Sequence, residues 1–530
     1  MRDQKTEWLA VSTAGLLIIG SWEQAIPKSH APEENARPEV RVVQGKVLGT
    51  LVEGGIAFRN LPYAAPPVGP NRWRAPQAAS SWRGTRDASV FGPSCPQAPR
   101  GWNDVDAKRA SEDCLSLNIW TPRVGQGTGQ PGLPVMVWIH GGGFTGGSAS
   151  NNFNDGTKLM RHGVVVVTIN YRLGVLGFLA HPDLVGETSD GSTGNYGLMD
   201  QVAALRWVHD NIAAFGGDPA NVTAFGQSAG SIAISWLITS KSARGLVNRA
   251  ILQSGNAFGS GLITLTRAQA EQVGQQFGAI AQLRQLPARK LIQRWQAFEA
   301  QAPREHVANA ILDEHLFRQQ PAKALLEGIG SNVAIIVGNN SQEFPVDQTA
   351  DQLRPYIMKS FGDQAEKALE YYFPEGNARS ADPLFGGAGT QLATDVTFRC
   401  GSILSSRASS LAWIYQFEQP RSGEAVTAHS HELVYVFGNW GPEWPLKQPM
   451  SPAELALLDQ MQSYWSNFAR TGDPNGPNLP PWPRYSRTDD PYLAISAEHT
   501  TARTHLRGEI CPLYVAHWSN AASYDTLAKD

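Results

Sequence analysis

The sequence predicts a doubly wound α/β fold, with a large, mostly parallel central sheet and helices on both of its faces. Continuous apolar runs bounded by turn residues recur along the chain, as expected of strands covered on both faces of a parallel sheet. Helical patterns lie between these runs, and such alternation is typical of this architecture. The predicted strands are Val135–Ile139, Val164–Ile169, Val222–Phe225, Ala250–Leu252, Val333–Val337 and Trp413–Phe417.

Two patterns define the connections. A helix is predicted over Leu198–Ile212, since Leu198, Val202, Leu205 and Ile212 share one face. Gly216-Gly217 would end it, and Asp218-Pro219 would turn the chain into the next strand. Residues 262–330 and 351–390 break the alternation with helical, loop-rich sequence. We expect these to be insertions over the strand ends, where they would roof a pocket.

Composition limits the classes of protein. The chain has 530 residues, of which 42% are hydrophobic and 17% charged, enough for a large core. No repeat and no shift in composition divides it, so we predict one domain over residues 39–530, after a leader and linker over residues 1–38. The net charge is −3 and no Lys/Arg cluster is present, which argues against nucleic acid or an anionic membrane as a partner.

The N-terminus resembles an export signal. Arg2 and Lys5 precede an apolar run, Leu9–Gly20, that is too short to span a bilayer and fits the apolar region of a signal peptide. Ala25 is a candidate cleavage position, and no Cys follows the run to carry a lipid anchor. We therefore expect a secreted or periplasmic protein. The alternative is that the N-terminal segment is a disordered leader of a cytoplasmic protein.

The four cysteines are Cys95, Cys114, Cys400 and Cys511. If all are oxidised they allow three pairings, of which Cys95–Cys114 with Cys400–Cys511 is the simplest. The chain-entropy argument gives these two bridges roughly 3 and 5 kcal/mol. Disulfides agree with export. Neither a C-x-x-C motif nor a Cys/His cluster with metal-site spacing is present, so no metal is expected.

Ser228 is the candidate nucleophile. It stands in Gly226-Gln227-Ser228-Ala229-Gly230, between the predicted strand Val222–Phe225 and a helical pattern over Ser231–Leu237. So sharp a strand-to-helix turn strains the central residue and requires small neighbours two positions away. The Ser hydroxyl is then left at a helix N-terminus, where negative charge is favoured.

A serine nucleophile needs a base and fixed donors for the oxyanion. His140-Gly141-Gly142-Gly143-Phe144 follows a predicted strand, and three glycines let backbone N–H groups turn inward without interference from a Cβ atom. Read alone this is a tight turn; beside Ser228 it predicts an oxyanion loop.

Over nearly its whole length, from about Val42 to about Trp518, the chain resembles the type-B carboxylesterases, the branch of the α/β-hydrolases that includes the cholinesterases. The resemblance implies an α/β-hydrolase fold with helical insertions over the active site, and it supports the two disulfide pairings given above. It rests on several long motifs in the same order: Ser111–Trp120, His140–Phe144, Ile169–Gly174, Gly194–Gln201, Phe215–Pro219, Phe225–Gly230 and Ile251–Gly255.

Carried over position by position, the family pattern makes Ser228 the nucleophile, Glu343 the acid and His429 the base, the last from the run His429–Gly438. The oxyanion donors would be the backbone N–H groups of Gly142, Gly143 and Ala229, and Ser254 would support the acid. The chain order Ser, acid, His, each after a predicted strand, agrees independently.

Other residues could fill the roles of acid and base. Asp347 and Asp395 are alternative acids, but neither stands at the same distance after a strand. His431 is two residues from His429 and is interpreted as a packing residue. A metal site at His-Ser-His-Glu would have too few ligands, and no cofactor is required.

Some positions depart from the pattern. Gln227 replaces the Glu that cholinesterases carry before the nucleophile, and Trp102 aligns poorly with a cation-binding Trp, so choline esters are disfavoured. Phe344 stands where many relatives have Gly after the acid, and Ser116 stands where the family prefers an aromatic residue or Thr.

The sequence thus predicts a serine carboxylesterase that hydrolyses small-molecule esters, with short to medium acyl chains favoured. Activity should rise with pH through about 6.5, where an ordinary His loses its proton. The alternatives are an amidase or carbamate hydrolase with the same residues, and a non-catalytic adhesion or binding member of the family. The sequence does not indicate the oligomeric state.

Overall fold

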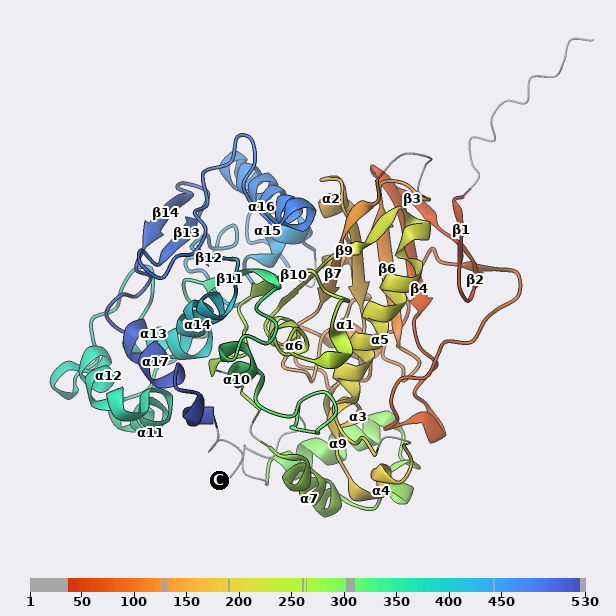
Figure 1. The fold of residues 1–530 in the computed structure, drawn as a ribbon, viewed down its shortest axis with the longest axis horizontal. Helices are drawn as coiled ribbons and strands as arrows, with labels where there is room; N and C mark the ends of the chain where they lie inside the picture. Colours follow the sequence, from red (N-terminus) through yellow and green to blue (C-terminus); the bar gives the residue numbers. More distant parts are fainter. Residues whose placement is uncertain are drawn as a thin grey trace, which may run out of the picture. The chain divides into compact units, whose positions relative to one another are not determined.

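Eleven strands of the described chain form the central sheet of the computed structural model (Figure 1). The structure describes residues 37–125, 131–188, 191–259, 262–263, 265–301, 310–441 and 444–524. In spatial order the strands are β14 (Thr501–Thr504), β13 (Pro491–Ile495), β12 (Ala412–Phe417), β11 (Ala334–Asn340), β10 (Arg249–Gln253), β9 (Gly217–Gln227), β7 (Leu133–Ile139), β8 (Val165–Ile169), β6 (Ser116–Thr121), β4 (Gly55–Pro62) and β3 (Thr50–Val52).

The middle of this sheet is parallel and its edges are antiparallel. All neighbours from β8 to β13 pair in parallel, whereas β3, β4, β6 and β14 pair antiparallel with their neighbours. All six predicted strands are found in the parallel part, which confirms the predicted fold class. The antiparallel edge strands were not predicted. A small separate sheet is formed by β1 (Glu39–Val42), β2 (Gly45–Leu48) and β5 (Thr85–Asp87).

Both faces of the sheet are covered, as the continuous apolar runs predict. Along β7, Val135 and Val137 belong to one buried core, while Met136 and Trp138 belong to the other. Because successive strand residues point to opposite faces, each core lies on one side. The first core includes α5 (Tyr196–Asn211), α6 (Ala229–Leu237) and α14 (Cys400–Ala408); the second includes α2 (Thr157–Met160), α15 (Leu433–Phe437) and α16 (Pro452–Thr471).

One connection differs from its prediction. Helix α5 matches the predicted helix to within two residues, and a 3₁₀ turn, Ile212–Phe215, follows it. Gly216, with φ 80°, ends this turn, but β9 already begins at Gly217 rather than after Asp218-Pro219. A register irregularity against β7 at this point lets the strand accept a proline that cannot donate to the ladder.

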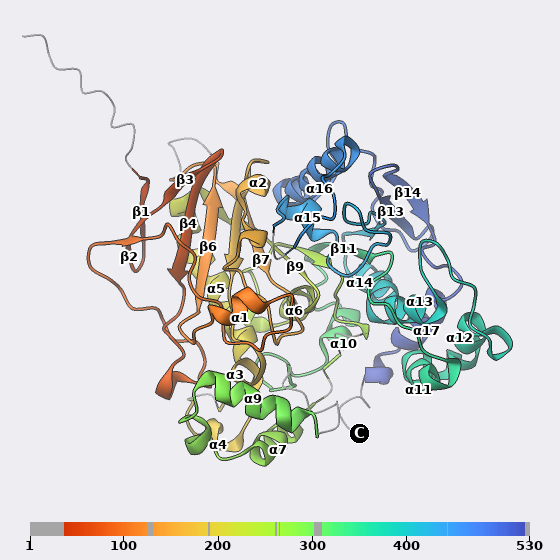
Figure 2. The same cartoon turned by 180° about the vertical axis from the view of Figure 1, so that it is seen from behind.

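The two insertions form helices mainly at the margins of the sheet. The first contains α7 (Arg267–Phe277), α8 (Ile280–Leu283), α9 (Ala288–Glu299) and α10 (Pro321–Leu326). In both views α7 and α9 lie near α3 (Gly174–Phe178) and α4 (Pro182–Val185) (Figures 1 and 2). The second contains α11 (Ala350–Phe361), α12 (Ala365–Tyr372) and α13 (Ala388–Thr394), beside α17 (Cys511–Trp518).

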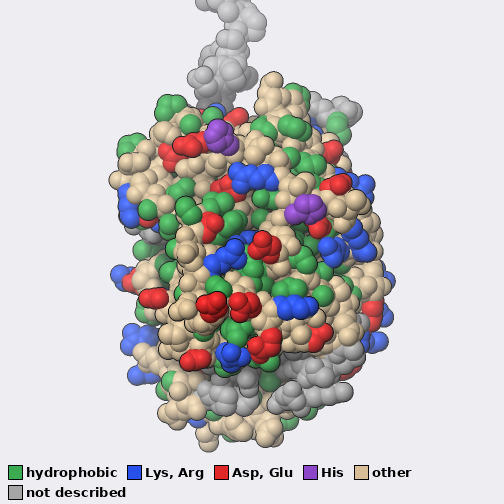
Figure 3. Space-filling view, turned by 90° about the vertical axis from the view of Figure 1, so that its left-hand side faces the viewer, with side chains coloured by type: hydrophobic (Ala, Val, Ile, Leu, Met, Phe, Trp, Pro, Cys, Tyr) green, Lys and Arg blue, Asp and Glu red, His purple; other side chains and the backbone are tan. Residues whose placement is uncertain are grey.

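From Arg37 onward the chain forms one compact unit. The predicted leader, apart from its last two positions, lies outside the described residues. Both predicted disulfides are confirmed, Cys95–Cys114 and Cys400–Cys511. No helix in the described ranges is long and apolar enough to cross a membrane. On the face shown in Figure 3, acidic and basic side chains are interspersed rather than segregated by sign.

Candidate active site

Five neighbouring parallel strands end at the same edge of the sheet, and each is followed by a residue or loop predicted to belong to the site. In spatial order, β12 is followed by His429, β11 by Glu343, β10 by Ser254, β9 by Ser228 and β7 by the loop His140–Phe144. The carboxyl edge of a parallel sheet is where α/β proteins place their ligands. The fold therefore gathers segments that are up to 290 positions apart in the chain.

Ser228 occupies the strained turn that the sequence predicts. It lies between β9 and α6 with φ 55° and ψ −127°, a conformation that L-residues rarely adopt. A Cβ atom on Gly226 would lie 2.7 Å from the carbonyl oxygen of Ile139, and one on Gly230 would lie 2.0 Å from it. Both glycines are therefore required by the close approach of β7 to this turn.

The loop after β7 presents unused donors. Gly142 and Gly143 have φ values of 108° and 61°. In the described part of the chain, the backbone N–H groups of Gly142, Gly143 and Ala229 donate no hydrogen bond to another protein group. His140, at the start of the loop, is buried and stacks on Tyr171 at 4.4 Å between ring centroids. Burial lowers the pKa of His140 to about 4, so this ring is a neutral packing residue.

Glu343 and His429 form a close pair. Nδ1 of His429 lies 2.6 Å from one carboxylate oxygen of Glu343. The other oxygen accepts hydrogen bonds from the Ser254 hydroxyl at 2.7 Å and the Asn340 backbone N–H at 2.8 Å. The His429 backbone N–H also donates to the Glu343 carbonyl at 3.0 Å. A carboxylate held in this way fixes the orientation and tautomer of the imidazole.

The other nitrogen of His429 faces Gln227, the residue before Ser228. Nε2 of His429 lies 3.0 Å from the side-chain amide nitrogen of Gln227, and His429 and Ser228 line the same cavity. Two phenylalanine rings flank the imidazole: Phe344 at 4.4 Å and Phe398 at 5.5 Å between centroids. The structure thus brings together Ser228, His429, Glu343, Ser254 and the glycine loop.

The cavity has a volume of about 450 Å³. Besides Ser228, Gln227 and His429, its described walls come from residues 100–106, 138–154 and 430–444, together with Phe344. No described wall residue comes from 262–330 or 351–390. The loop closed by the Cys95–Cys114 disulfide supplies Trp102 to the walls.

Sequence reasoning missed a second buried carboxylate. Glu432 is fully buried and accepts hydrogen bonds from Gln253 at 3.2 Å and from the side chain of Asn340 at 2.7 Å. Burial, and next the charge of Glu343, raise the pKa of Glu432 to about 7. Its position in the run His429–Gly438 was visible in the sequence, but nothing there indicated that its side chain is enclosed.

The rival residues have other roles. Asp347 is exposed, and Asp395 is buried in ion pairs with Arg399 and Arg507. His431 accepts a hydrogen bond from the Ala428 backbone N–H through Nδ1, as a packing residue would. Among the described residues, the one group with metal-site spacing is Asp395, Cys400 and Cys511. Because both sulfur atoms form a disulfide, it offers no thiolate ligand.

The parallel sheet and the sharp turn between β9 and α6 define the chain as an α/β-hydrolase. Its sequence matches the carboxylesterase family over residues 36–513, and the chain belongs to that family. It is therefore a carboxylic ester hydrolase.

Named relatives agree with this family assignment. The chain is 39% identical over 506 residues to the fumonisin B1 esterase of Sphingopyxis macrogoltabida, covering 91% of each chain. It is 35% identical over 500 residues to the phenmedipham hydrolase of Pseudarthrobacter oxydans, covering 87% of this chain and 95% of that one. Among solved structures, a PNB esterase superposes with a TM-score of 0.79 at 31% identity, covering 90% of this chain and 99% of the other.

Proposed function

We propose that the protein is a serine carboxylesterase in which Ser228, His429 and Glu343 act as nucleophile, base and acid. The observation that carries this proposal is the 2.6 Å contact between Nδ1 of His429 and Glu343, in a cavity that the strained Ser228 also lines. Nδ1 donates its proton to the carboxylate, which leaves the lone pair on Nε2 to accept the proton of the Ser228 hydroxyl.

The reaction follows from these positions. Ser228 attacks the ester carbonyl, and the N–H groups of Gly142, Gly143 and Ala229 stabilise the oxyanion, each by about 3 kcal/mol. Glu343 stabilises the imidazolium that forms. His429 then returns its proton to the leaving alcohol, an acyl-enzyme remains, and water repeats the sequence to release the acid.

Substrates with a short to medium acyl chain fit the cavity best. Its volume is within the usual range for small-molecule sites, and Trp138, Phe153 and Trp444 give it apolar walls. Gln227 supplies an amide, rather than a carboxylate, beside the nucleophile, which disfavours choline esters. The same residues could cleave an amide or carbamate, so leaving-group preference is a separate measurement.

Labelling tests the assignment. A fluorophosphonate probe followed by peptide mapping should modify Ser228, and Ser228→Ala should abolish both labelling and turnover while its thermal unfolding stays close to that of the wild type. Undiminished hydrolysis by Ser228→Ala would reject the proposal. A panel of p-nitrophenyl esters of increasing chain length, beside matched anilides, then measures acyl length and ester preference.

We further infer that the protein is exported, from its two disulfides and the signal-like run Leu9–Gly20. Fractionation of the producing cells, with sequencing of the mature N-terminus, tests this inference. A mature protein that retains Met1 in a reducing compartment would contradict it.

A further inference from the structure

A π-helical turn and the residue before it contact both members of the proposed acid–base pair. Residues Asp395–Arg399, which we call the π-turn, join α13 to α14. Thr394, immediately before it, accepts a hydrogen bond from the backbone N–H of Glu343 at 3.3 Å. Within it, the Phe398 ring lies nearly parallel to that of His429. π-turns within helices are rare and occur often at functional sites.

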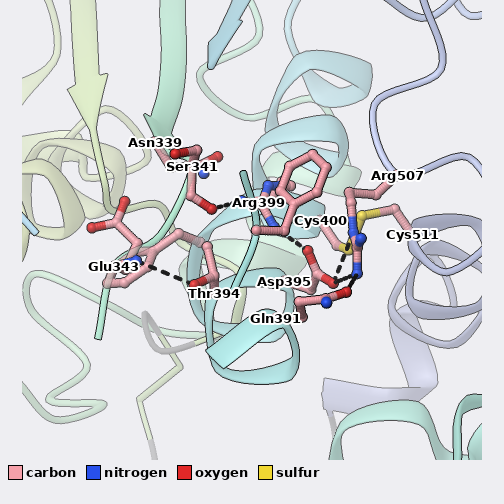
Figure 4. A network of polar contacts seen from close by, with 12 residues as sticks. Asn339, Ser341, Glu343, Gln391, Thr394, Asp395, Arg399, Cys400, Arg507 and Cys511 are labelled. Carbon is pink, nitrogen blue, oxygen red and sulfur yellow. Dashed lines mark hydrogen bonds and ion pairs between the residues drawn. A yellow bond between two sulfur atoms is a disulfide. The ribbon is translucent and has the colours of Figure 1, made fainter. Parts of the chain in front are cut away.

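Arg399 is one of the completely buried residues of the π-turn. Its side chain is completely buried, and all three nitrogens of the guanidinium have acceptors. Nε donates to Gln416 at 3.1 Å. One terminal nitrogen pairs with Asp395, and the other donates to the Ser341 carbonyl at 2.6 Å (Figure 4). A buried guanidinium is tolerated only when it is fully paired in this manner.

The loop that carries Glu343, which we call the acid loop, leaves the sheet at Ser341, directly after β11. The Ser341 backbone N–H donates to the Phe417 carbonyl at 2.8 Å, and Glu343 follows two residues later. The loop is therefore fixed at two points by the α13–α14 segment: at the Ser341 carbonyl by Arg399, and at the Glu343 N–H by Thr394. Residues 341–343 belong to no helix or strand.

The π-turn is anchored on its far side. Asp395 also pairs with Arg507 at 2.7 Å and accepts a hydrogen bond from the Tyr372 hydroxyl at 2.9 Å. Arg507 precedes α17, whose first residue, Cys511, is disulfide-bonded to Cys400, the neighbour of Arg399. Figure 4 shows the two arginines on either side of Asp395. Arg399 is thus fixed on one side by Asp395, which Arg507 and Tyr372 hold in turn, and it binds the Ser341 carbonyl on the other. Its guanidinium therefore gives that carbonyl a fixed donor.

We propose that Arg399 is a positioning residue for the reaction, which holds Glu343 against His429 by fixing the Ser341 carbonyl. This inference rests on the proposed function. A displacement of about 1 Å at a reacting group can cost about 10²-fold in rate. Loosening this loop should therefore lower kcat, because the carboxylate no longer orients the imidazole. It should change KM little, because all the described cavity walls except Phe344 come from other segments.

Arg399→Lys tests the proposal. Lysine keeps the charge beside Asp395, but its single ammonium nitrogen cannot reach three acceptors that are spread around a planar guanidinium. We expect kcat to fall about 10- to 100-fold with KM changed less than about threefold. The proton of the short His429–Glu343 hydrogen bond should give a low-field ¹H NMR signal in the wild type, and the variant should lose this signal or shift it upfield.

Arg72→Lys is the matched control. Arg72 is also buried, pairs with Glu112 through two nitrogens and donates to the carbonyls of residues 283, 284 and 286. It contacts none of the residues that surround Glu343. Its substitution should reduce stability comparably while kcat and the low-field signal stay at their wild-type values. An equal loss of kcat in both variants would overturn the proposal, as would a wild-type kcat and signal in Arg399→Lys.

Thr394→Val provides a second test if Arg399→Lys does not fold. It removes only the acceptor for the Glu343 N–H. A lower kcat with an unchanged KM and a shifted low-field signal supports positioning by the α13–α14 segment, and no change in any of them overturns it. The NMR signal reports the Glu343–His429 contact whatever the nucleophile is. Failure of the proposed function would be seen separately, as activity retained in Ser228→Ala.

Discussion

The side-chain amide of Gln227 lies 3.0 Å from Nε2 of His429, the ring nitrogen opposite the one that faces Glu343. Since Nδ1 donates its proton to Glu343, Nε2 carries the lone pair and the amide is the donor. Gln227 thus occupies the lone pair that, in the proposed mechanism, accepts the proton of Ser228. The residue that differs from the cholinesterase pattern is the one that contacts the proposed base.

Gln227→Glu should therefore change the pH dependence. A carboxylate at this position would favour the protonated imidazole, so the acid limb of the kcat/KM profile should move to higher pH by about one unit. Gln227→Met, which removes the hydrogen bond to the neutral imidazole but adds no charge, should move that limb less than Gln227→Glu does. Profiles of kcat/KM between pH 5 and 9 locate the acid limb in both variants. An unmoved limb in Gln227→Glu would show that residue 227 does not influence the protonation of His429.

Glu343→Gln tests the acid. The amide introduced at position 343 would either turn its N–H toward Nδ1 of His429 or accept a weaker hydrogen bond through its oxygen. The protonated ring of His429 would also lose the negative charge that stabilises it. We expect kcat to fall about 10³- to 10⁴-fold, by analogy with removal of the corresponding carboxylate in serine proteases. Ser254→Ala should cost far less, because the Asn340 N–H still holds the same carboxylate oxygen. A Glu343→Gln variant within tenfold of the wild type would exclude Glu343 as the acid.

The sequence could predict the site's five segments because elements that follow neighbouring parallel strands meet at one edge. Glu343, three residues after β11, follows this rule. It could not predict the cavity walls, since many of these come from segments 100–106 and 430–444, whose approach depends on the whole fold. Asp395 illustrates the same limit. Its neighbours Arg399 and Arg507 are four and 112 positions away, and only the folded chain shows that they neutralise it.

Gly230→Ala should prevent formation of the Ser228 turn. The added Cβ would lie 2.0 Å from the Ile139 carbonyl oxygen, which belongs to the sheet and cannot move aside. We expect a loss of about 3 kcal/mol or more in the free energy of unfolding, together with loss of activity. Gly186→Ala is the control, because Gly186 has a right-handed helical conformation and open space around it. Urea unfolding of both variants compares them; similar stabilities would contradict this account of the turn.

Replacement of both Cys400 and Cys511 by Ser should destabilise the protein more than the same change at Cys95 and Cys114. The Cys400–Cys511 and Cys95–Cys114 bridges span 111 and 19 residues. Loss of the first should lower the free energy of unfolding by about 4–5 kcal/mol, and loss of the second by about 3 kcal/mol. Denaturant unfolding of the two double variants gives this ranking. If the Cys400–Cys511 bridge also helps to hold the π-turn, kcat should fall in that variant alone.

His431 should make the protein sensitive to acid. Burial, and next the charge of Arg421, lower its pKa to about 4, and its Nδ1 accepts the Ala428 N–H. The unfolded chain binds this proton near pH 6.5, so stability is fully present above that pH and is lost as pH falls toward 4. At pH 4.5 this loss amounts to about 2 kcal/mol. His431→Asn keeps an acceptor but cannot titrate, so its free energy of unfolding should match the wild type at pH 7.5 and exceed it at pH 4.5. Equal acid losses in the two proteins would show that the His431 proton is not responsible.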